Sequence, residues 1–357
     1  MTRRLLEGSE AVAEAMVAAG CRFFAGYPMT PFTEVLEHMA RLLPEHGGTC
    51  INAESELEAV GMAWGAAATG TRAATGSTGQ GLSLMQESLS ELVSAHIPMV
   101  VLNMARAQGD YFQATRGGGH GDYRMPVLAP KDAAEAVSLM ATAFELADQW
   151  RTPVLVFGDY YLAHTAQSVD VPEAGTPPAA PEWALDGSTG GSGRAKLLSP
   201  LGDHKRRDDV GYDLQEHYRG VARSVQEMTE GIEPRYEEFH SEDADVVVMA
   251  WGTPGRYVRA AVKELRDTGV PVGFLRPITL YPFPDAAVQR AAKHAKLVAV
   301  YENNQGQMID DVRLALEGRA PVRFIGGLSL DHSGFGIAPD LEVATMRARI
   351  EEVVGTC

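Results

Sequence analysis

The sequence contains very little cysteine, with only Cys21, Cys50 and Cys357 among its 357 residues. A disulfide framework is typical of short secreted chains with closely spaced cysteine pairs, and neither condition holds here. An iron–sulfur cluster usually takes four cysteine thiolates, which three scattered residues cannot provide. We therefore expect no disulfide framework and no iron–sulfur cluster in this chain.

An excess of positive charge and long apolar runs are also missing. The net charge of −16 opposes nonspecific binding to nucleic acid or to an anionic membrane, because both are negative. No apolar run is long enough to cross a bilayer, and Glu7 interrupts the region where a signal peptide would need its apolar segment. We expect a cytoplasmic protein with no nucleic-acid and no membrane partner.

The motifs of several common enzyme classes are absent as well. The sequence has no GxSxG, HExxH or CxxC pattern, so a serine-hydrolase elbow and the common zinc sites have no support. The STGQG segment at 77–81 has neither the GxGxxG spacing nor the lysine that nucleotide-binding loops use. Its glycines do permit a close approach of backbone to a ligand. We assign no metal-binding residue to this chain.

Short apolar runs alternate with amphipathic segments up to about residue 165. The pattern predicts strands at 21–26, 71–75, 98–104 and 152–158, and helices at 9–19, 32–43, 55–69, 82–94 and 132–149. Ser9 is the predicted N-cap of the first helix, Gly20 is its predicted stop, and the last helix begins at Asp132. Such alternation predicts a parallel sheet that is covered by helices on both faces.

The alternation breaks after residue 165 and resumes near residue 244. The intervening segment is rich in Pro, Gly and Ser and then strongly polar, which favours a linker that wraps over the surface. The second alternation predicts strands at 244–252, 270–275, 295–302 and 321–326, and helices at 254–267, 284–293 and 306–316. The predicted α/β chain has a first domain at 1–165, a linker at 166–240, a smaller α/β domain at 241–335 and a helical tail at 336–357.

A cluster of acidic residues marks the start of the predicted helix 55–69. Ser55 is followed three residues later by Glu58, the pattern of a capping box, which gives Glu58 a structural role. Glu56 falls in the first helical turn, where the helix dipole favours an anion. A surface acid is the commoner explanation for such a residue, and a functional carboxylate is the alternative.

Two further segments place polar side chains where predicted strands end. Pro28 and Pro31 stiffen the turn GYPMTP around Thr30, whose hydroxyl would meet a ligand at the carboxyl edge of a sheet. An ordinary turn is equally compatible with that segment. Arg106 directly follows the strand 98–104, where its guanidinium could pair with a carboxylate or make a surface ion pair.

The stretch that follows Arg106 is unusually rich in glycine. Four glycines surround His120 within RGGGHGDYR, and ordering such a loop is entropically expensive. Long loops of this kind are usually functional or disordered. A lone histidine is usually not catalytic, but this setting makes His120 a candidate site residue.

The order of these motifs resembles a known family. GYPMTPFTE, then NAESELEAVGMAWGAAATGTRAATGSTGQGLSLMQE, PMVVLNMAR and DYFQATRGGGHGDYRMPVLAP together resemble the pyrimidine domain of thiamine-diphosphate-dependent 2-oxoacid:ferredoxin oxidoreductases. FLRPITLYPFP and VAVYENNQGQM resemble the family's second domain, which is similar to the transketolase C-terminal domain. GGGHGDYR is most similar to the branch that acts on branched-chain 2-oxoacids such as 3-methyl-2-oxobutanoate, and 2-oxoglutarate enzymes share most of the rest.

The resemblance implies roles for the candidate residues. Glu56 matches the glutamate that bonds the aminopyrimidine ring and promotes proton loss from the thiazolium carbon of thiamine diphosphate. Thr30 and Arg106 match positions that contact the carboxylate and carbonyl of the substrate, and we also predict His120 as substrate-binding. Pro28 and Gly79 are the remaining predicted cofactor contacts.

The resemblance also implies a partner chain. The sequence has no GDG with a downstream Asn, the pattern by which thiamine-diphosphate enzymes hold Mg²⁺ on the diphosphate. We therefore expect a different, beta-type subunit to supply the diphosphate, Mg²⁺ and iron–sulfur sites in a heterotetramer, and the chain to be inactive alone. The expected reaction is oxidative decarboxylation of a 2-oxoacid to an acyl-CoA, with electrons passed to ferredoxin.

One departure from the family leaves the substrate open. Relatives often carry a longer Gly/Pro-rich segment after the arginine that matches Arg106, and here RAQGDYF follows at once. The identity of the 2-oxoacid and the use of coenzyme A as acceptor are both left open by that shorter loop. Two alternative functions remain: a non-oxidative thiamine-dependent decarboxylase or ligase subunit, and a non-catalytic scaffold for a cofactor-bearing partner.

Overall fold

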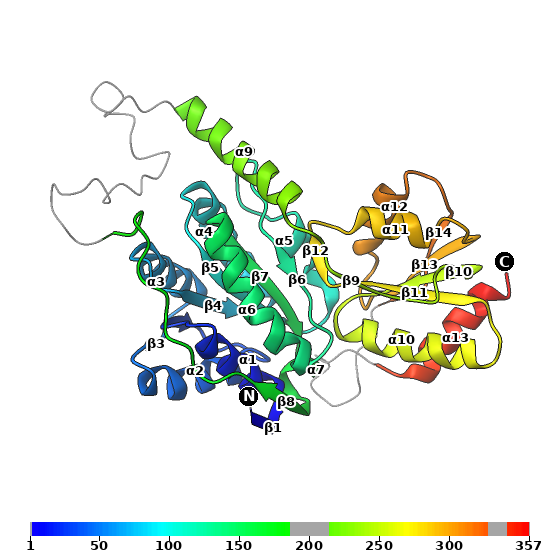
Figure 1. Cartoon of the computed structure of the whole chain (residues 1–357), viewed down its shortest axis with the longest axis horizontal. Coiled ribbons are helices and arrows are strands. Elements are labelled where there is room, and N and C mark those ends of the chain that lie inside the picture. Colours follow the sequence, from blue (N-terminus) through cyan, green and yellow to red (C-terminus); the bar gives the residue numbers. More distant parts are fainter. Residues whose placement is uncertain (1, 186–213, 328–340, 357) are drawn as a thin grey trace.

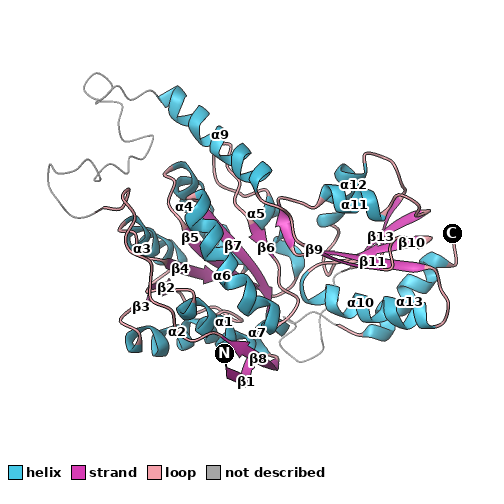
Figure 2. Cartoon of the chain, in the orientation of Figure 1, coloured by secondary structure: helices cyan, strands magenta, loops and turns pink. Residues whose placement is uncertain are grey.

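Two β-sheets, each flanked by helices, make up most of the chain (Figures 1 and 2). The computed structural model describes residues 2–185, 214–327 and 341–356. A sheet with helices on both faces, followed by a smaller α/β unit, is the fold that the alternation of apolar and amphipathic segments predicts, and that prediction is confirmed. Among the described residues, no helix combines the length and the apolar character that crossing a bilayer requires.

The larger sheet has seven strands, and its central strands are parallel. Their order across the sheet is β12 (Thr279–Tyr281), β6 (Val127–Leu128), β7 (Pro153–Asp159), β5 (Met99–Ala105), β4 (Ala73–Ser77), β2 (Phe23–Gly26) and β3 (Thr49–Asn52). Only the β12–β6 pair is antiparallel. Every residue of β4, β5 and β7 is buried, which explains why β5 and β7 appear in the sequence as largely apolar runs without polar alternation.

Helices cover the two faces of this sheet through separate apolar clusters. One cluster is built with α1 (Gly8–Ala18), α2 (Thr33–Glu45) and α6 (Ala133–Trp150). The other contains side chains of α3 (Glu56–Ala68) and α4 (Gly79–Ser94), which pack against each other. Because α2 and α3 lie on opposite faces, the chain changes direction between β2 and β4, and this is where ligands bind in open α/β sheets.

The smaller sheet has five strands. Their order is β14 (Val322–Phe324), β13 (Leu297–Val300), β10 (Val246–Met249), β11 (Val272–Pro277) and β9 (Tyr236–Phe239). Only β9 is antiparallel to its neighbour. Helices α10 (Gly252–Asp267) and α13 (Val343–Val354) share one apolar cluster with this sheet, and α11 (Asp285–Ala291) and α12 (Met308–Leu316) belong to another.

The two sheets are joined by a continuous core. The cluster that contains α11 and α12 also contains residues of α3, α4 and β5. Trp251, only 1% exposed, lies in the joint, with its ring centroid 4.8 Å from that of Phe157 and 5.6 Å from that of Tyr111. A large apolar interface of this kind opposes relative motion of the two units.

The predicted ends of α1 and α6 can be compared with the structure. Asp132 caps α6 as predicted, since its side chain accepts a hydrogen bond from the N–H of Glu135. Gly20 follows the end of α1 in the left-handed conformation, with φ of +85°, which a glycine adopts without strain. The prediction of Ser9 as N-cap is wrong: α1 begins one residue earlier, and Ser9 is buried within it.

The segment predicted as a linker at 166–240 contains regular structure where it is described. Strand β8 (Ala166–Val171) pairs with the N-terminal β1 (Thr2–Glu7), and α9 (Leu214–Gly231) packs against α4. Strand β9 belongs to the smaller sheet. Residues 186–213, which hold most of the glycine-rich part, lie outside the described residues. Within the predicted tail, α13 packs against α10.

Candidate functional site

The candidate site lies where four neighbouring strands of the larger sheet end. Strands β5, β4, β2 and β3 are adjacent and parallel, so their carboxyl ends meet at one edge. Arg106 follows β5, Thr78 follows β4, the turn 27–31 follows β2, and Glu56 begins the helix after β3. The fold therefore gathers at one edge polar residues that are up to 76 positions apart in the chain, such as Thr30 and Arg106.

Glu56 is buried at this edge, with only 3% of its surface exposed. The hydroxyl of Ser77, itself fully buried, donates a hydrogen bond of 2.8 Å to Oε1 of Glu56. Oε2 has no hydrogen-bond partner among the described residues. The interpretation of Glu56 as a surface acid is therefore wrong: the structure shows a buried carboxylate with one oxygen bonded to Ser77.

The backbone around Glu56 is shaped to admit this carboxylate. Gly81 lies so close that a side chain there would collide with the Ser77 hydroxyl and with Oε1 of Glu56. Ser55 is the N-cap of α3, but its hydroxyl bonds to the Glu58 carboxylate and makes no side-chain cap to the helix backbone. Neither backbone hydrogen bond of the predicted capping box is found among the described residues, and the Glu58 side chain is exposed at the surface.

Arg106 and Thr30 are in direct contact. Nε of Arg106 donates to the carbonyl oxygen of Thr30 at 3.3 Å, and a terminal nitrogen approaches Sδ of Met29 at 3.6 Å. No carboxylate pairs with Arg106 in the described part of the chain, so the alternative of a surface ion pair is not supported. Other N–H groups of the Arg106 guanidinium remain available, and they could donate hydrogen bonds to a carboxylate of a ligand.

Arg106 lines a polar cavity of about 330 Å³ at the start of α4. The other lining residues are Thr78, Gly79, Gln80, Ser83, Ala107, Gly109, Asp110 and Gln113. The predicted cofactor residue Gly79 is therefore part of this wall. Thr30 and Glu56 do not line the cavity themselves, but Thr30 contacts Arg106 and Glu56 is bonded to Ser77, the neighbour of Thr78.

Asp110 introduces a carboxyl group into the same cavity. Its carboxylate lies against Gly79, where an added Cβ would come within 2.5 Å of Oδ1, and it accepts a hydrogen bond of 3.1 Å from Asn103. Burial raises the pKa of Asp110, while the Asn103 hydrogen bond and the charge of Arg106 act in the opposite direction. Asp110 is thus the negative group that faces Arg106 across the cavity.

Two buried polar atoms at this edge have no hydrogen-bond partner. These are Oγ1 of Thr78, which is 1% exposed and lines the cavity, and Oδ1 of Asn103, which is fully buried. A buried polar atom without a partner is costly, and such atoms are found where a ligand, ion or water completes the bonding. Their position supports a polar ligand at this edge of the sheet.

His120 lies apart from the other predicted site residues. It is half exposed, and its Nε2 bonds at 2.8 Å to Glu91 near the far end of α4. Twelve residues separate Gly79 from Glu91 on that helix, which corresponds to about 18 Å at the rise of an α-helix. Pro28 is exposed in the turn after β2. The structure thus brings together Thr30, Glu56, Gly79 and Arg106, but not His120.

Ser77, Thr78, Asn103 and Asp110 were not predicted from the sequence. Asn103 carries the clearest signal that could have been used, because it is a polar residue within the apolar run PMVVLNM. Ser77 and Thr78 belong to STGQG, for which a glycine-rich turn was the expected feature. Only the pairing of β4 with its neighbours shows that these side chains face Glu56 and Arg106.

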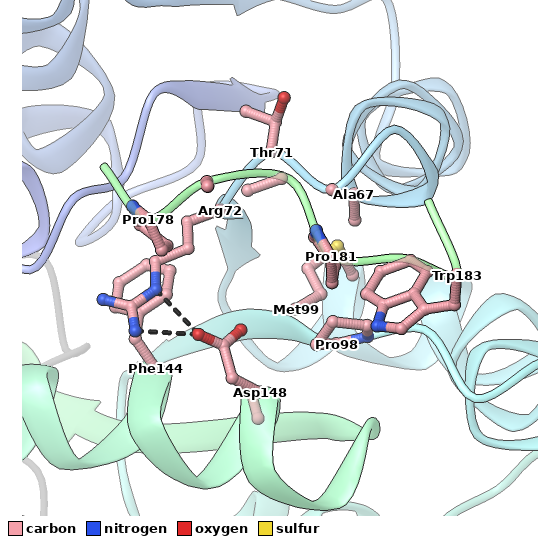
Figure 3. Close-up of a pocket in the computed structure, with 14 residues that line it drawn as sticks. Ala67, Thr71, Arg72, Pro98, Met99, Phe144, Asp148, Pro178, Pro181 and Trp183 are labelled. Atoms are coloured by element: carbon pink, nitrogen blue, oxygen red, sulfur yellow. Dashed lines mark hydrogen bonds and ion pairs between the residues drawn. The ribbon is translucent and has the colours of Figure 1, made fainter. Parts of the chain in front are cut away.

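A second cavity lies at the opposite edge of the larger sheet (Figure 3). It measures about 220 Å³ and is bordered by the first residues of β4 and β5 and by the chain at 178–183. Arg72 dominates its polar wall, with two hydrogen bonds to one oxygen of Asp148 and another to the carbonyl of Ala19. Among the described residues, no buried polar side-chain atom in that wall lacks a hydrogen-bond partner, which is typical of a packing contact.

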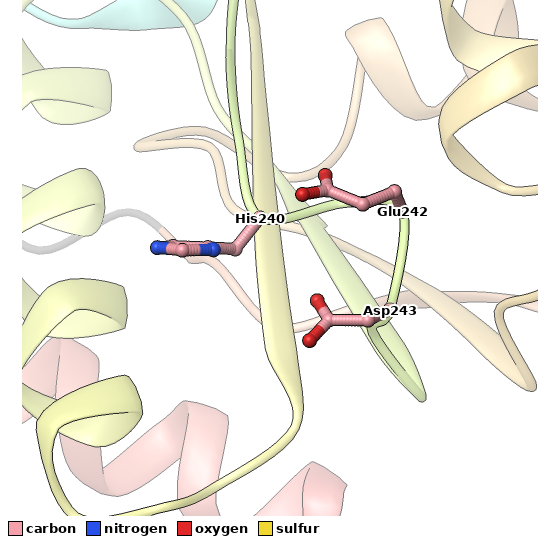
Figure 4. A group of neighbouring side chains, drawn as sticks. All are labelled: His240, Glu242 and Asp243. Carbon is pink, nitrogen blue, oxygen red and sulfur yellow. The ribbon is translucent and has the colours of Figure 1, made fainter.

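An exposed cluster of potential metal ligands lies next to the smaller sheet (Figure 4). His240, Glu242 and Asp243 approach within 4.8 Å of one another, and all three are exposed. Both oxygens of Asp243 bond to the guanidinium of Arg266, at 2.6 and 3.0 Å. The ion pair with Arg266 accounts for the position of Asp243 without a metal ion.

Comparison with known proteins identifies families for both halves of the chain. Residues 14–186 match the family model described as pyruvate flavodoxin/ferredoxin oxidoreductase, thiamine diphosphate-binding, and residues 244–332 match pyruvate:ferredoxin oxidoreductase core domain II. The ketoisovalerate oxidoreductase subunit VorB of Methanothermobacter marburgensis is 37% identical over 326 residues, covering 88% of this chain and 90% of that protein. The 2-oxoglutarate synthase subunit KorA of Methanothermobacter thermautotrophicus is 34% identical over 350 residues, covering 90% and 93%.

Two solved structures have folds similar to that of this chain. The 2-oxoglutarate:ferredoxin oxidoreductase from Magnetococcus marinus, with 2-oxoglutarate, coenzyme A and succinyl-CoA bound, superposes with a TM-score of 0.81 at 26% identity. The match covers 99% of this chain and 65% of that longer chain. A split-gene transketolase, described as an inactive beta4 tetramer, has a TM-score of 0.58 at 15% identity and shares the fold.

Proposed function

Because the chain belongs to the 2-oxoacid:ferredoxin oxidoreductase family, we propose that it supplies the pyrimidine-binding half of an active site that it shares with a different subunit. The reaction is oxidative decarboxylation of a 2-oxoacid, with electrons passing to ferredoxin through iron–sulfur centres of that subunit. The observation that carries this proposal is the buried Glu56 carboxylate, which uses one oxygen for Ser77 and keeps the other for a ligand.

The residues at the edge fit the aminopyrimidine of thiamine diphosphate. A buried carboxylate favours a ligand with a ring N–H donor, because an unpaired charge is costly in an apolar environment. Gly81 lets the side chains of Ser77 and Glu56 approach the start of α4, and Oγ1 of Thr78 has no partner among the described residues. When bound, thiamine diphosphate supplies the nucleophilic carbon that attacks the 2-oxo group of the substrate. The role of Glu56 is to hold a proton at the ring nitrogen.

Arg106 is the residue that we assign to the substrate carboxylate. Its guanidinium rests on the carbonyl of Thr30 and retains free donors, and paired donors match a carboxylate better than a point charge does. Asp110 faces the same cavity and opposes the entry of a second negative group near Arg106. This favours a substrate with one carboxylate, and the likeness to the ketoisovalerate subunit makes a branched-chain 2-oxoacid the first to test.

The partner subunit would cover the exposed surface of α3 and α4. Leu57, Met62 and Leu84 are 48%, 38% and 48% exposed there, close in sequence to Glu56 and Gly81. Gly61 and Gly65 on α3 have open space where a side chain would be, so another chain could approach the helix closely. This chain offers no diphosphate or Mg²⁺ residues by the sequence analysis, and we propose that the partner provides them together with the clusters.

The test is reconstitution of the chain with a beta-type partner subunit. We expect 2-oxoacid-dependent reduction of ferredoxin with release of CO₂, strongest with branched-chain 2-oxoacids in a panel that includes pyruvate and 2-oxoglutarate. Release of CO₂ without ferredoxin reduction would show a non-oxidative decarboxylase instead. Full activity of a folded complex that carries Glu56→Gln would show that this chain is a scaffold.

A further inference from the structure

Gln108 differs from its neighbours in the loop that borders the polar cavity. Arg106, Ala107, Gly109 and Asp110 all line that cavity, whereas Gln108 does not and is 2% exposed. Its side chain is directed into the joint between the two sheets. Nε2 donates to the carbonyl of Trp251 at 3.0 Å, and Oε1 accepts from the backbone N–H of Asn303 at 2.7 Å.

The loop at 302–308 of the smaller unit holds the same segment at further points. Asn304 donates from its side chain to the carbonyl of Gln108 at 2.9 Å. Gln307 donates to the carbonyl of Gly109 at 2.8 Å and accepts from the N–H of Phe112 at 2.9 Å. The backbone of the segment 108–112, which we call the cavity loop together with Arg106 and Ala107, is thus hydrogen-bonded to a loop almost 200 residues away in the chain.

The 302–308 loop is itself held in place by hydrogen bonds to one buried carboxylate. The carboxylate of Glu302, fully buried, accepts hydrogen bonds from the side chain of Asn304 and from the backbone N–H groups of Gln307, Met308 and Ile309. These last groups begin α12, whose dipole favours an anion at that end. A loop held in this way can act as a rigid support for the segment that it contacts.

We infer that Gln108 is a positioning residue: through it, the smaller unit fixes the loop that carries Arg106 and Asp110 at the edge of the substrate cavity. This inference rests on the function proposed above. Arg106 has few contacts of its own, so the direction of its guanidinium depends on where the loop holds its backbone. Because a displacement of about 1 Å at a substrate-binding group can cost much of its effect, the loss of Gln108 acts on the substrate through Arg106.

The experiment compares Gln108→Ala, Gln108→Glu and Asn304→Ala in the reconstituted complex. Gln108→Ala should raise the KM for the 2-oxoacid roughly tenfold, in line with the loss of a buried hydrogen-bonded amide, and leave thiamine diphosphate affinity unchanged. Gln108→Glu keeps the acceptor for Asn303 but sets a buried carboxylate against the carbonyl of Trp251, so it should raise the KM at least as much as Gln108→Ala. Gln108→Ala and Asn304→Ala should be non-additive when combined, since their separate hydrogen bonds hold the same segment of the loop.

Gln289→Ala is the matched control. Gln289 also bonds a backbone carbonyl in the smaller unit, that of Ala315 at 2.8 Å, but it contacts no residue of the cavity loop. Its loss should lower stability without changing the KM. A Gln108→Ala complex that loses stability like this control, with an unchanged KM at a temperature where it is folded, would overturn the inference.

Hydrogen exchange separates this inference from the proposed function. Gln108→Ala should speed amide exchange of residues 106–112 in the complex about tenfold, whether or not the complex turns over a 2-oxoacid. If the wild-type complex oxidises no 2-oxoacid, the proposed function is wrong. If amide exchange of residues 106–112 is unchanged in Gln108→Ala, Gln108 does not hold this loop in place, whatever the function of the complex.

Discussion

The two edges of the larger sheet carry similar residue types but leave them in different states. At the amino edge, Arg72 bonds Asp148 and the carbonyl of Ala19, and the chain at 178–183 covers the cavity. At the carboxyl edge, the guanidinium of Arg106 bonds a carbonyl and approaches a sulfur, and buried atoms of Thr78 and Asn103 have no hydrogen-bond partner in the described part of the chain.

That difference distinguishes a packing site from a binding site better than cavity size does. Each cavity has an arginine and an aspartate in its wall, yet among the described residues only the cavity at the carboxyl edge is lined by a buried polar atom without a hydrogen-bond partner, Oγ1 of Thr78. A buried polar group without a hydrogen-bond partner lowers stability, and a bound ligand that bonds to the group offsets this loss. The comparison predicts that substitutions at the carboxyl edge change activity and that substitutions at the amino edge change stability.

The largest effect should follow from Glu56→Gln in the reconstituted complex. Loss of a group that moves or holds a proton costs about 10²–10⁴-fold in turnover, and glutamine preserves the size of the side chain. Steady-state rates of ferredoxin reduction measure the loss. Glu58→Gln is the control on the same helical turn, because Glu58 is exposed, and it should have nearly normal activity.

Arg106→Ala should produce the next largest effect. Removing charge-assisted hydrogen bonds to a carboxylate costs about 1.5–3 kcal/mol, which corresponds to roughly 10–150-fold in kcat/KM. Cofactor affinity should be unchanged, and Arg106→Lys should recover only part of the loss because it lacks the paired donors. An equal fall in thiamine diphosphate affinity would mean that Arg106 contacts the cofactor or supports the fold.

Arg72→Met tests the other edge. The variant loses hydrogen bonds to Asp148 and Ala19 in a partly exposed setting, so the free energy of unfolding should fall by about 1–2 kcal/mol. Chemical denaturation of the chain gives that value. The kcat/KM of the folded complex should stay within about twofold of wild type, and a larger loss would break the contrast between the edges.

The smallest effect should come from Asp110→Asn and should depend on pH. Burial raises the pKa of Asp110 above its ordinary value of 3.8, so ionising it opposes folding. The stability that the protonated carboxyl of Asp110 contributes to the folded chain is fully present below pH 3.8. It is lost as the pH rises through the pKa of Asp110 in the folded state. The variant should therefore melt about 1–2 °C above wild type at pH 7, and this gain should shrink toward pH 4. A gain in melting temperature that is the same at pH 4 and pH 7 would show that ionisation of Asp110 does not oppose folding.

The sequence predicted the strands that carry a strong apolar signal. β5 and β7 are largely apolar and were found to within a residue or so, whereas the strands β1, β3, β6, β8, β9 and β12 were missed, β3 because it is short and largely unburied. Ser9 was misassigned as a cap since α1 begins directly after β1, a strand that only its pairing with β8 reveals.

The site was only partly accessible from the sequence. Thr30, Glu56, Gly79 and Arg106 were predicted through motif order, and in the structure they lie at one edge of the sheet. The burial of Glu56 depends on the Ser77 contact, which requires β3 and β4 to flank β2. Local sequence carries no information about such pairing, and the same is true of the contact between Gln108 and Asn303 across 195 residues.

The most direct test of the account is calorimetric titration of thiamine diphosphate with Mg²⁺, performed on the purified chain and on its complex with the partner subunit. The account assigns only the pyrimidine half of the site to this chain. It therefore predicts weak or undetectable binding to the chain alone and tight, Mg²⁺-dependent binding to the complex. Tight stoichiometric binding to the isolated chain would contradict it.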